Sequence, residues 1–147
     1  MPRRAPHPLP CLLACLLPAC LEALAPDVGP PAPMPACDDD LDPTRAVSFR
    51  GAVSPILGRA CTSCHAPGGE GFQSSGLDLS TYAALRAGGT RSGAAIAVDG
   101  QPCASALWQK LGPTPPFGAR MPRNALPLPQ GDIDLIHDWI AEGARDD

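Results

Sequence analysis

Two cysteines and a histidine lie together in the segment Cys61-Thr62-Ser63-Cys64-His65. Thiols three positions apart fall on neighbouring positions of one helical turn, so both can add to the two vinyl groups on one edge of a haem. The adjacent imidazole of His65 can then ligate the iron. The spacing therefore predicts one covalent haem c, attached through Cys61 and Cys64, with His65 as the proximal ligand.

The CxxCH pattern is short, and two other kinds of site use similar cysteine pairs. A structural zinc site needs a second pair of ligands, but beyond the N-terminal leader the chain offers only His137 and the separate Cys37 and Cys103. A thioredoxin-like redox pair needs a βαβ context, whereas residues 49–60 have the apolar spacing of a helix. We therefore favour covalent haem over both.

The second axial ligand is expected from a later loop, and the conventional candidates are Met34, Met121 and His137. Met34 lies in a proline-rich spacer. Pro122 biases Met121 away from helical geometry and holds it on an extended loop. His137 is offset from the apolar stripe of its helix and is expected at the surface between acidic neighbours. Met121 is the predicted distal ligand.

The elements that must position these residues are predicted to be helices. Ser80 can cap a short helix that stops at Gly88, and Pro102 can open another that runs through Leu111. A last helix, ended by Gly143, has an apolar stripe at helical spacing, formed by Ile133, Ile136, Trp139 and Ile140. These patterns predict an all-α domain.

The composition is low in bulky core residues and acidic in charge. The chain has 20 Pro and 15 Gly but only three Phe, two Trp and one Tyr, so a haem can supply apolar mass that the side chains lack. The formal net charge is −4, and no basic face for phosphates is apparent, which argues against nucleic acid as a partner. A redox partner with a basic docking patch, or with a weakly charged encounter surface, is expected.

Residues 1–25 have the pattern of a signal peptide. Arg3 and Arg4 form the basic start, and residues 12–19 form an apolar run that is too short to span a membrane. The pattern predicts export to the periplasm of a bacterium.

The cleavage site decides how the exported chain is held. Leu17-Pro18-Ala19-Cys20 resembles a lipobox, in which Cys20 becomes the lipidated first residue and anchors the protein to a membrane. A cut after Ala25 would instead release a soluble protein. Residues 26–43 are a proline-rich and acidic linker, and residues 44–147 are left for the folded domain.

Several motifs between Val47 and Ala144 resemble, in content and in order, those of small planctomycete-type cytochrome c domains. The motifs are Val47-Ser48-Phe49, Pro55-Ile56-Leu57, CTSCH, Gly76-Leu77-Asp78-Leu79, Tyr82-Ala83-Ala84-Leu85, Ala104-Ser105-Ala106-Leu107-Trp108, Arg120-Met121-Pro122, Pro127-Leu128-Pro129 and Trp139-Ile140-Ala141-Glu142-Gly143-Ala144.

The resemblance implies a small class I cytochrome c fold, with helices at both ends of the domain packed around haem. It also implies Cys61 and Cys64 for attachment, with His65 and Met121 as the iron ligands. Two residues depart from the family pattern. Pro129 stands where Ser or Thr usually caps the last helix, and Cys103 stands where a polar residue is expected.

Cys37 and Cys103 remain after haem attachment and lipidation of Cys20 are assigned. In an oxidising compartment the two can form a disulfide that ties the N-terminal arm to the domain. Two buried free thiols are the alternative, and the sequence does not decide between them.

These features predict an electron carrier rather than an enzyme, because no acid, base or nucleophile constellation is recognisable. Its expected partners are redox proteins and, during maturation, the haem-attachment machinery. A haem-based gas sensor or a haem enzyme is the alternative if Met121 leaves the sixth iron position open. A third hypothesis is a structural lipoprotein in which the CTSCH sequence occurs by chance and binds no haem.

Overall fold

The computed structural model describes residues 37–147, which are helical and contain no strand. The predicted signal peptide, the lipobox at Cys20 and most of the linker lie outside these residues. The helical elements are the π-helix η1 (Phe49–Val53), α1 (Ser54–Ala60), α2 (Glu70–Ser75), α3 (Tyr82–Ala87), the 3₁₀ turns η2 (Gly93–Ile96) and η3 (Pro102–Ala104), α4 (Ala106–Gln109) and α5 (Gln130–Ala141). The prediction of an all-α chain agrees with this part of the structure.

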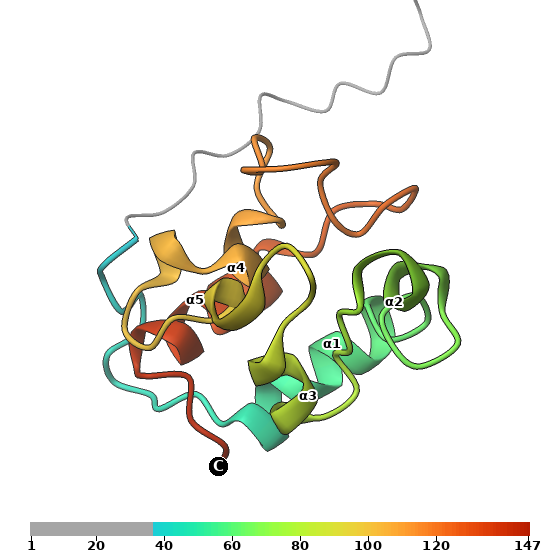
Figure 1. The fold of residues 1–147 in the computed structure, drawn as a ribbon. Coiled ribbons are helices and arrows are strands. Elements are labelled where there is room, and N and C mark those ends of the chain that lie inside the picture. Colours follow the sequence, from blue (N-terminus) through green and yellow to red (C-terminus); the bar gives the residue numbers. More distant parts are fainter. Residues whose placement is uncertain (1–36) are drawn as a thin grey trace, which may run out of the picture. The chain divides into compact units, whose positions relative to one another are not determined.

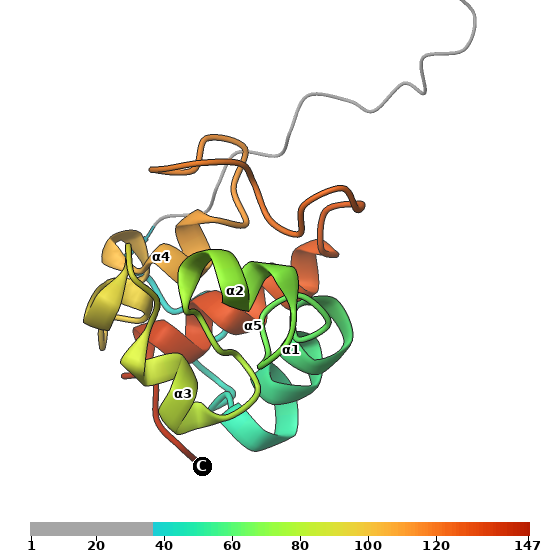
Figure 2. The same ribbon diagram turned by 45° about the vertical axis from the view of Figure 1, so that its right-hand side comes forward.

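Helix α5 packs against η1 and α4, so the two ends of the domain meet in its core (Figures 1 and 2). Its predicted apolar stripe is buried, with Ile133, Ile136, Trp139 and Ile140 each at most 4% exposed. The Phe49 ring of η1 lies 5.4 Å from Trp139 and 5.2 Å from Tyr82 of α3. These aromatic contacts join the N-terminal and C-terminal helices.

Backbone and side-chain hydrogen bonds fasten the same two ends together. The backbone N–H of Arg50 donates to the carbonyl of Asp147 at 2.9 Å, and that of Val47 donates to the Glu142 carboxylate, also at 2.9 Å. Pro129 is the N-cap of α5 and provides no side-chain cap, as its position in the sequence indicated.

Helix α3 begins one residue later than predicted. Thr81, not Ser80, is its N-cap, and the Thr81 hydroxyl accepts a hydrogen bond from the Ala84 backbone N–H at 3.1 Å. Ser80 instead donates to the neighbouring Asp78 carboxylate. The predicted stop is confirmed, because Gly88 follows the helix with a positive φ of 70° that favours glycine.

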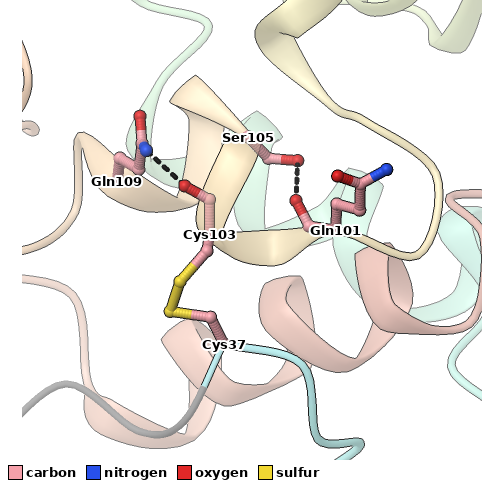
Figure 3. The surroundings of a disulfide bond; sticks show 5 residues. All are labelled: Cys37, Gln101, Cys103, Ser105 and Gln109. Carbon is pink, nitrogen blue, oxygen red and sulfur yellow. Dashed lines mark hydrogen bonds between the residues drawn. A yellow bond between two sulfur atoms is a disulfide. The ribbon is translucent and has the colours of Figure 1, made fainter.

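The predicted helix from Pro102 through Leu111 is interrupted at Ser105, which separates η3 from α4. The Ser105 hydroxyl is fully buried and donates to the carbonyl of Gln101 at 2.9 Å (Figure 3). It also accepts a hydrogen bond from the Val98 N–H. These bonds fasten the break between η3 and α4 to the backbone of Val98 and Gln101.

Cys37 and Cys103 form a disulfide, with their Cα atoms 4.8 Å apart (Figure 3). The bond ties the first described residue to η3 across 66 positions of sequence. Of the two alternatives that the sequence left open, the structure has the disulfide.

Candidate functional site

The CTSCH segment forms a tight turn directly after α1. Cys61 ends the helix, and its backbone N–H donates to the carbonyl of Leu57 at 2.9 Å. The N–H groups of Cys64 and His65 both donate back to the Cys61 carbonyl, at 3.1 and 2.8 Å. One turn of backbone therefore carries Cys61, Cys64 and His65.

The two cysteines of this turn are free thiols, unlike Cys37 and Cys103. Cys64 is exposed, and Cys61 is half-buried against the apolar core. Burial raises the pKa of the Cys61 thiol to about 11, with Arg59 acting against this shift and Cys64 adding to it. Both sulfur atoms remain available for covalent attachment.

The His65 side chain is partly buried between the turn and the segment that follows α2. The backbone carbonyl of His65 accepts a hydrogen bond from the Leu79 N–H at 2.7 Å. Burial lowers the pKa of His65, while a backbone interaction with Leu77 partly opposes the shift. The neutral imidazole is thereby favoured, and it is the form that can ligate a metal ion.

Met121 lies in the loop between α4 and α5, as predicted, and is half-buried. Its backbone N–H donates to the carbonyl of Lys110 at 2.8 Å. The preceding residue, Arg120, donates from Nε to the carbonyl of Leu111 at 2.7 Å. The backbone that carries the thioether is thus fastened to the C-terminal end of α4.

No hydrogen bond within residues 37–147 joins the turn of residues 61–65 to the loop that carries Met121. The structure brings Cys61, Cys64 and His65 together, and it holds Met121 on a separate loop. Ligation by Met121 therefore stays a prediction.

Residues 61–122 match the family model described as planctomycete cytochrome C. The predicted resemblance is confirmed over this segment. No curated protein and no solved structure gave a significant match. A planctomycete-type cytochrome c domain implies a covalently bound haem c with its iron, and a role in electron transfer follows from that cofactor.

Two buried polar atoms lie within the matched residues 61–122 and have no partner in the described part of the chain. Nδ1 of His65 and Nε1 of Trp108 have no hydrogen-bond partner, although Trp108 is only 3% exposed. A buried polar group left without a partner costs about 1–3 kcal/mol. A haem offers iron to an imidazole and carboxylates to an indole N–H, so these residues fit the group that the family implies.

The zinc and thioredoxin alternatives gain no support from residues 37–147. No group of three or more His, Cys, Asp or Glu side chains in this range could hold a metal ion. The same residues contain no strand from which a βαβ unit could be built.

The prediction that His137 is a surface residue is wrong. Its side chain is fully buried, and its ring lies 5.4 Å from that of Trp108. Nδ1 lies 3.0 Å from the Asp138 carboxylate, which also accepts the Leu41 backbone N–H at 2.9 Å. His137 thus belongs to a buried polar network of α5 with the N-terminal segment.

The sequence did not indicate that the indole N–H of Trp108 is buried without a hydrogen-bond partner. Trp108 was noted only as part of a family motif, and its unpartnered N–H becomes visible once its burial is known. Helix α2, between the haem motif and Gly76, was not predicted either.

No helix in the described part of the chain has the length and apolar character needed to cross a membrane.

Proposed function

We propose that this protein is a monohaem electron carrier, with haem attached through Cys61 and Cys64 and with His65 and Met121 as axial ligands. The family match carries this proposal. It begins at the first cysteine of CTSCH and ends at the residue after Met121. Both segments that would meet the iron therefore belong to the matched part of the chain.

The residues of the turn support the attachment part of the proposal. The thiols of Cys61 and Cys64 are free, and the turn that holds them also carries His65. When bound, the haem supplies a one-electron couple between ferric and ferrous iron. The chain's own contribution is to hold the imidazole in its neutral form and to present the thioether of Met121 from a fastened loop.

Filled axial positions distinguish a carrier from a gas sensor or a haem enzyme. A thioether opposite an imidazole stabilises ferrous iron and gives a fairly high reduction potential, which suits a carrier. If the sixth iron position is open, a gas sensor or a haem enzyme replaces the electron carrier as the proposed function.

We further propose that the protein is exported and works in the periplasm, either soluble or anchored through a lipidated Cys20. The Leu17-Pro18-Ala19-Cys20 pattern supports anchoring. The full chain has a net charge of −4, and removal of a leader that carries Arg3 and Arg4 makes the exported protein more acidic, which favours redox partners with a basic docking patch. Mass spectrometry of the mature N-terminus tests the anchor, and an unmodified chain that begins after residue 20 rules it out.

The test of attachment is a double substitution in a bacterial host that has haem-attachment machinery. Cys61→Ala with Cys64→Ala should yield protein from which acid acetone removes all haem, whereas wild-type protein should keep it. Haem still held covalently in the double variant would refute the assignment.

Ligation is tested by substituting the two methionines that follow the leader, one at a time. Met121→Ala should abolish the weak long-wavelength band of a bond between ferric iron and methionine sulfur, lower the potential and open the iron to carbon monoxide. Met34→Ala is the matched control and should leave all three properties unchanged. Wild-type protein that lacks the band and binds carbon monoxide readily would favour the sensor or enzyme reading.

A further inference from the structure

Lys110 lies at the start of the segment that leads to Met121 and is hydrogen-bonded to residues near the end of that segment. The residue lies directly after α4, and its carbonyl accepts the Met121 backbone N–H at 2.8 Å. Its side-chain ammonium donates to the carbonyls of Phe117 and Ala119. One residue therefore bridges the start of the loop to three positions near its end.

The Phe117 ring strengthens this arrangement. It lies 4.9 Å from the Lys110 ammonium and packs against the apolar core. A cation over an aromatic face is attracted by the negative charge of the ring face, and the attraction is stronger where water is excluded. The lysine is half-buried at this point, so its stem and its charge both contribute to the contact.

The loop between Lys110 and Met121 has no helix or strand of its own. Its carbonyls must be satisfied by side chains or water, since no regular hydrogen-bond ladder is present. The ammonium of Lys110 takes two of these carbonyls, and Arg120 takes that of Leu111. These bonds restrict the positions that the Met121 backbone can occupy.

We propose that Lys110 is a positioning residue that holds the Met121 loop in the conformation in which the thioether ligates the iron. This inference rests on the proposed function, in which Met121 is the distal ligand. Without the ammonium the loop can adopt more conformations, and a larger share of molecules leaves the sixth iron position open.

The test compares three variants of the full matured protein. Lys110→Met removes the ammonium and keeps an apolar stem of similar length. Lys110→Arg keeps a cation that can donate to two carbonyls. Arg50→Met is the control for loss of one positive charge, because Arg50 is an exposed residue paired with Asp146.

Two properties of each variant are measured: the thermal loss of the long-wavelength ferric band, and the rate at which ferrous protein binds carbon monoxide. Lys110→Met should lose the band at a lower temperature and bind carbon monoxide about 5- to 30-fold faster, the change expected from the loss of one or two hydrogen bonds. Lys110→Arg should recover most of the wild-type behaviour, and Arg50→Met should match wild type.

A separate measurement addresses the loop itself. Hydrogen exchange of the Met121 backbone amide should be faster in Lys110→Met than in Arg50→Met, with covalent haem content equal in the two. If Lys110→Met fails to fold, Lys110→Gln, whose amide can donate to a carbonyl without charge, is measured in the same way.

The outcomes separate this inference from the proposed function. If wild-type protein has the ferric band and Lys110→Met keeps it, with unchanged thermal loss and carbon monoxide binding, the proposed role of Lys110 is wrong. Ligation by Met121 is then unaffected. A wild-type protein without the band overturns both, because Met121 is then not the ligand that the loop positions.

Discussion

Gly71 of α2 lies directly against the imidazole of His65. A Cβ atom at position 71 would lie 2.8 Å from Cε1 and 2.9 Å from both ring nitrogens, closer than real Cβ contacts come. The absence of a side chain on α2 therefore makes room for the ring that the turn of residues 61–65 presents.

Gly71→Ala is expected to disturb His65. A ligated imidazole cannot rotate away from the new methyl group, so the strain should cost about 1–3 kcal/mol. We expect a smaller low-spin fraction in the ferric spectrum and a lower midpoint of denaturant unfolding. Gly58→Ala is the control, since a Cβ atom at position 58 meets nothing within 4 Å. Because position 58 lies in helix α1, this substitution should leave stability unchanged or raise it by about 1 kcal/mol. Equal spectra for the two variants would show that the contact does not constrain the ligand.

Removal of the Cys37–Cys103 disulfide is expected to lower stability without altering the iron site. Its closed loop spans 66 positions of sequence, and loss of a native disulfide from a small exported domain costs about 2–5 kcal/mol. Cys37→Ser with Cys103→Ser should therefore unfold at a lower denaturant concentration and keep the wild-type visible spectrum. Alkylation of unreduced wild-type protein should leave residues 37 and 103 unmodified, and modification at both would contradict the bond.

The N-cap of α3 can be tested with two neighbouring hydroxyl residues. Thr81→Ala should reduce the free energy of unfolding by about 1 kcal/mol, because Thr81 accepts the Ala84 N–H. Ser80→Ala should have a smaller effect, since Ser80 is exposed and bonds only to Asp78. Denaturant titration of both variants measures the difference in the free energy of unfolding. A larger loss in Ser80→Ala than in Thr81→Ala would show that Ser80 is the N-cap.

His137→Ala is expected to destabilise the domain while the iron ligands stay in place. The substitution removes a fully buried ring that packs on Trp108 and contacts Asp138. A loss of about 2–5 kcal/mol is typical for a large buried side chain. The long-wavelength ferric band should persist in the folded fraction. Loss of low-spin ligation in that fraction would make His137, rather than Met121, the distal ligand.

The features that the sequence predicted correctly depend on local spacing. The buried stripe of α5 follows from apolar residues at helical intervals, and the CTSCH turn follows from residues within one helical turn of one another. The stop of α3 at Gly88 follows from the conformational freedom of glycine. In each case the pattern and its physical cause lie within a few residues.

The features that it missed depend on partners far away in the chain. His137 is buried because Trp108 and the backbone of Leu41 meet α5 in space. The break at Ser105 depends on bonds to Val98 and Gln101 that only the folded loop supplies. Met121 could be placed on a loop, but its approach to the iron could not be derived because the cofactor itself would join the two segments.

The disulfide of the domain also bears on the order in which the protein matures. Thioether bonds form from thiols, so Cys61 and Cys64 must stay reduced in a compartment that oxidises cysteines. Among the single disulfides that the four described cysteines can form, Cys37–Cys103 alone leaves both haem thiols free. Any mispaired bond would block attachment at one sulfur or at both. Early closure of Cys37 onto Cys103 would remove the thiols that could capture Cys61 or Cys64 singly, so the Cys61–Cys64 bond would be the one competing disulfide left among these four cysteines.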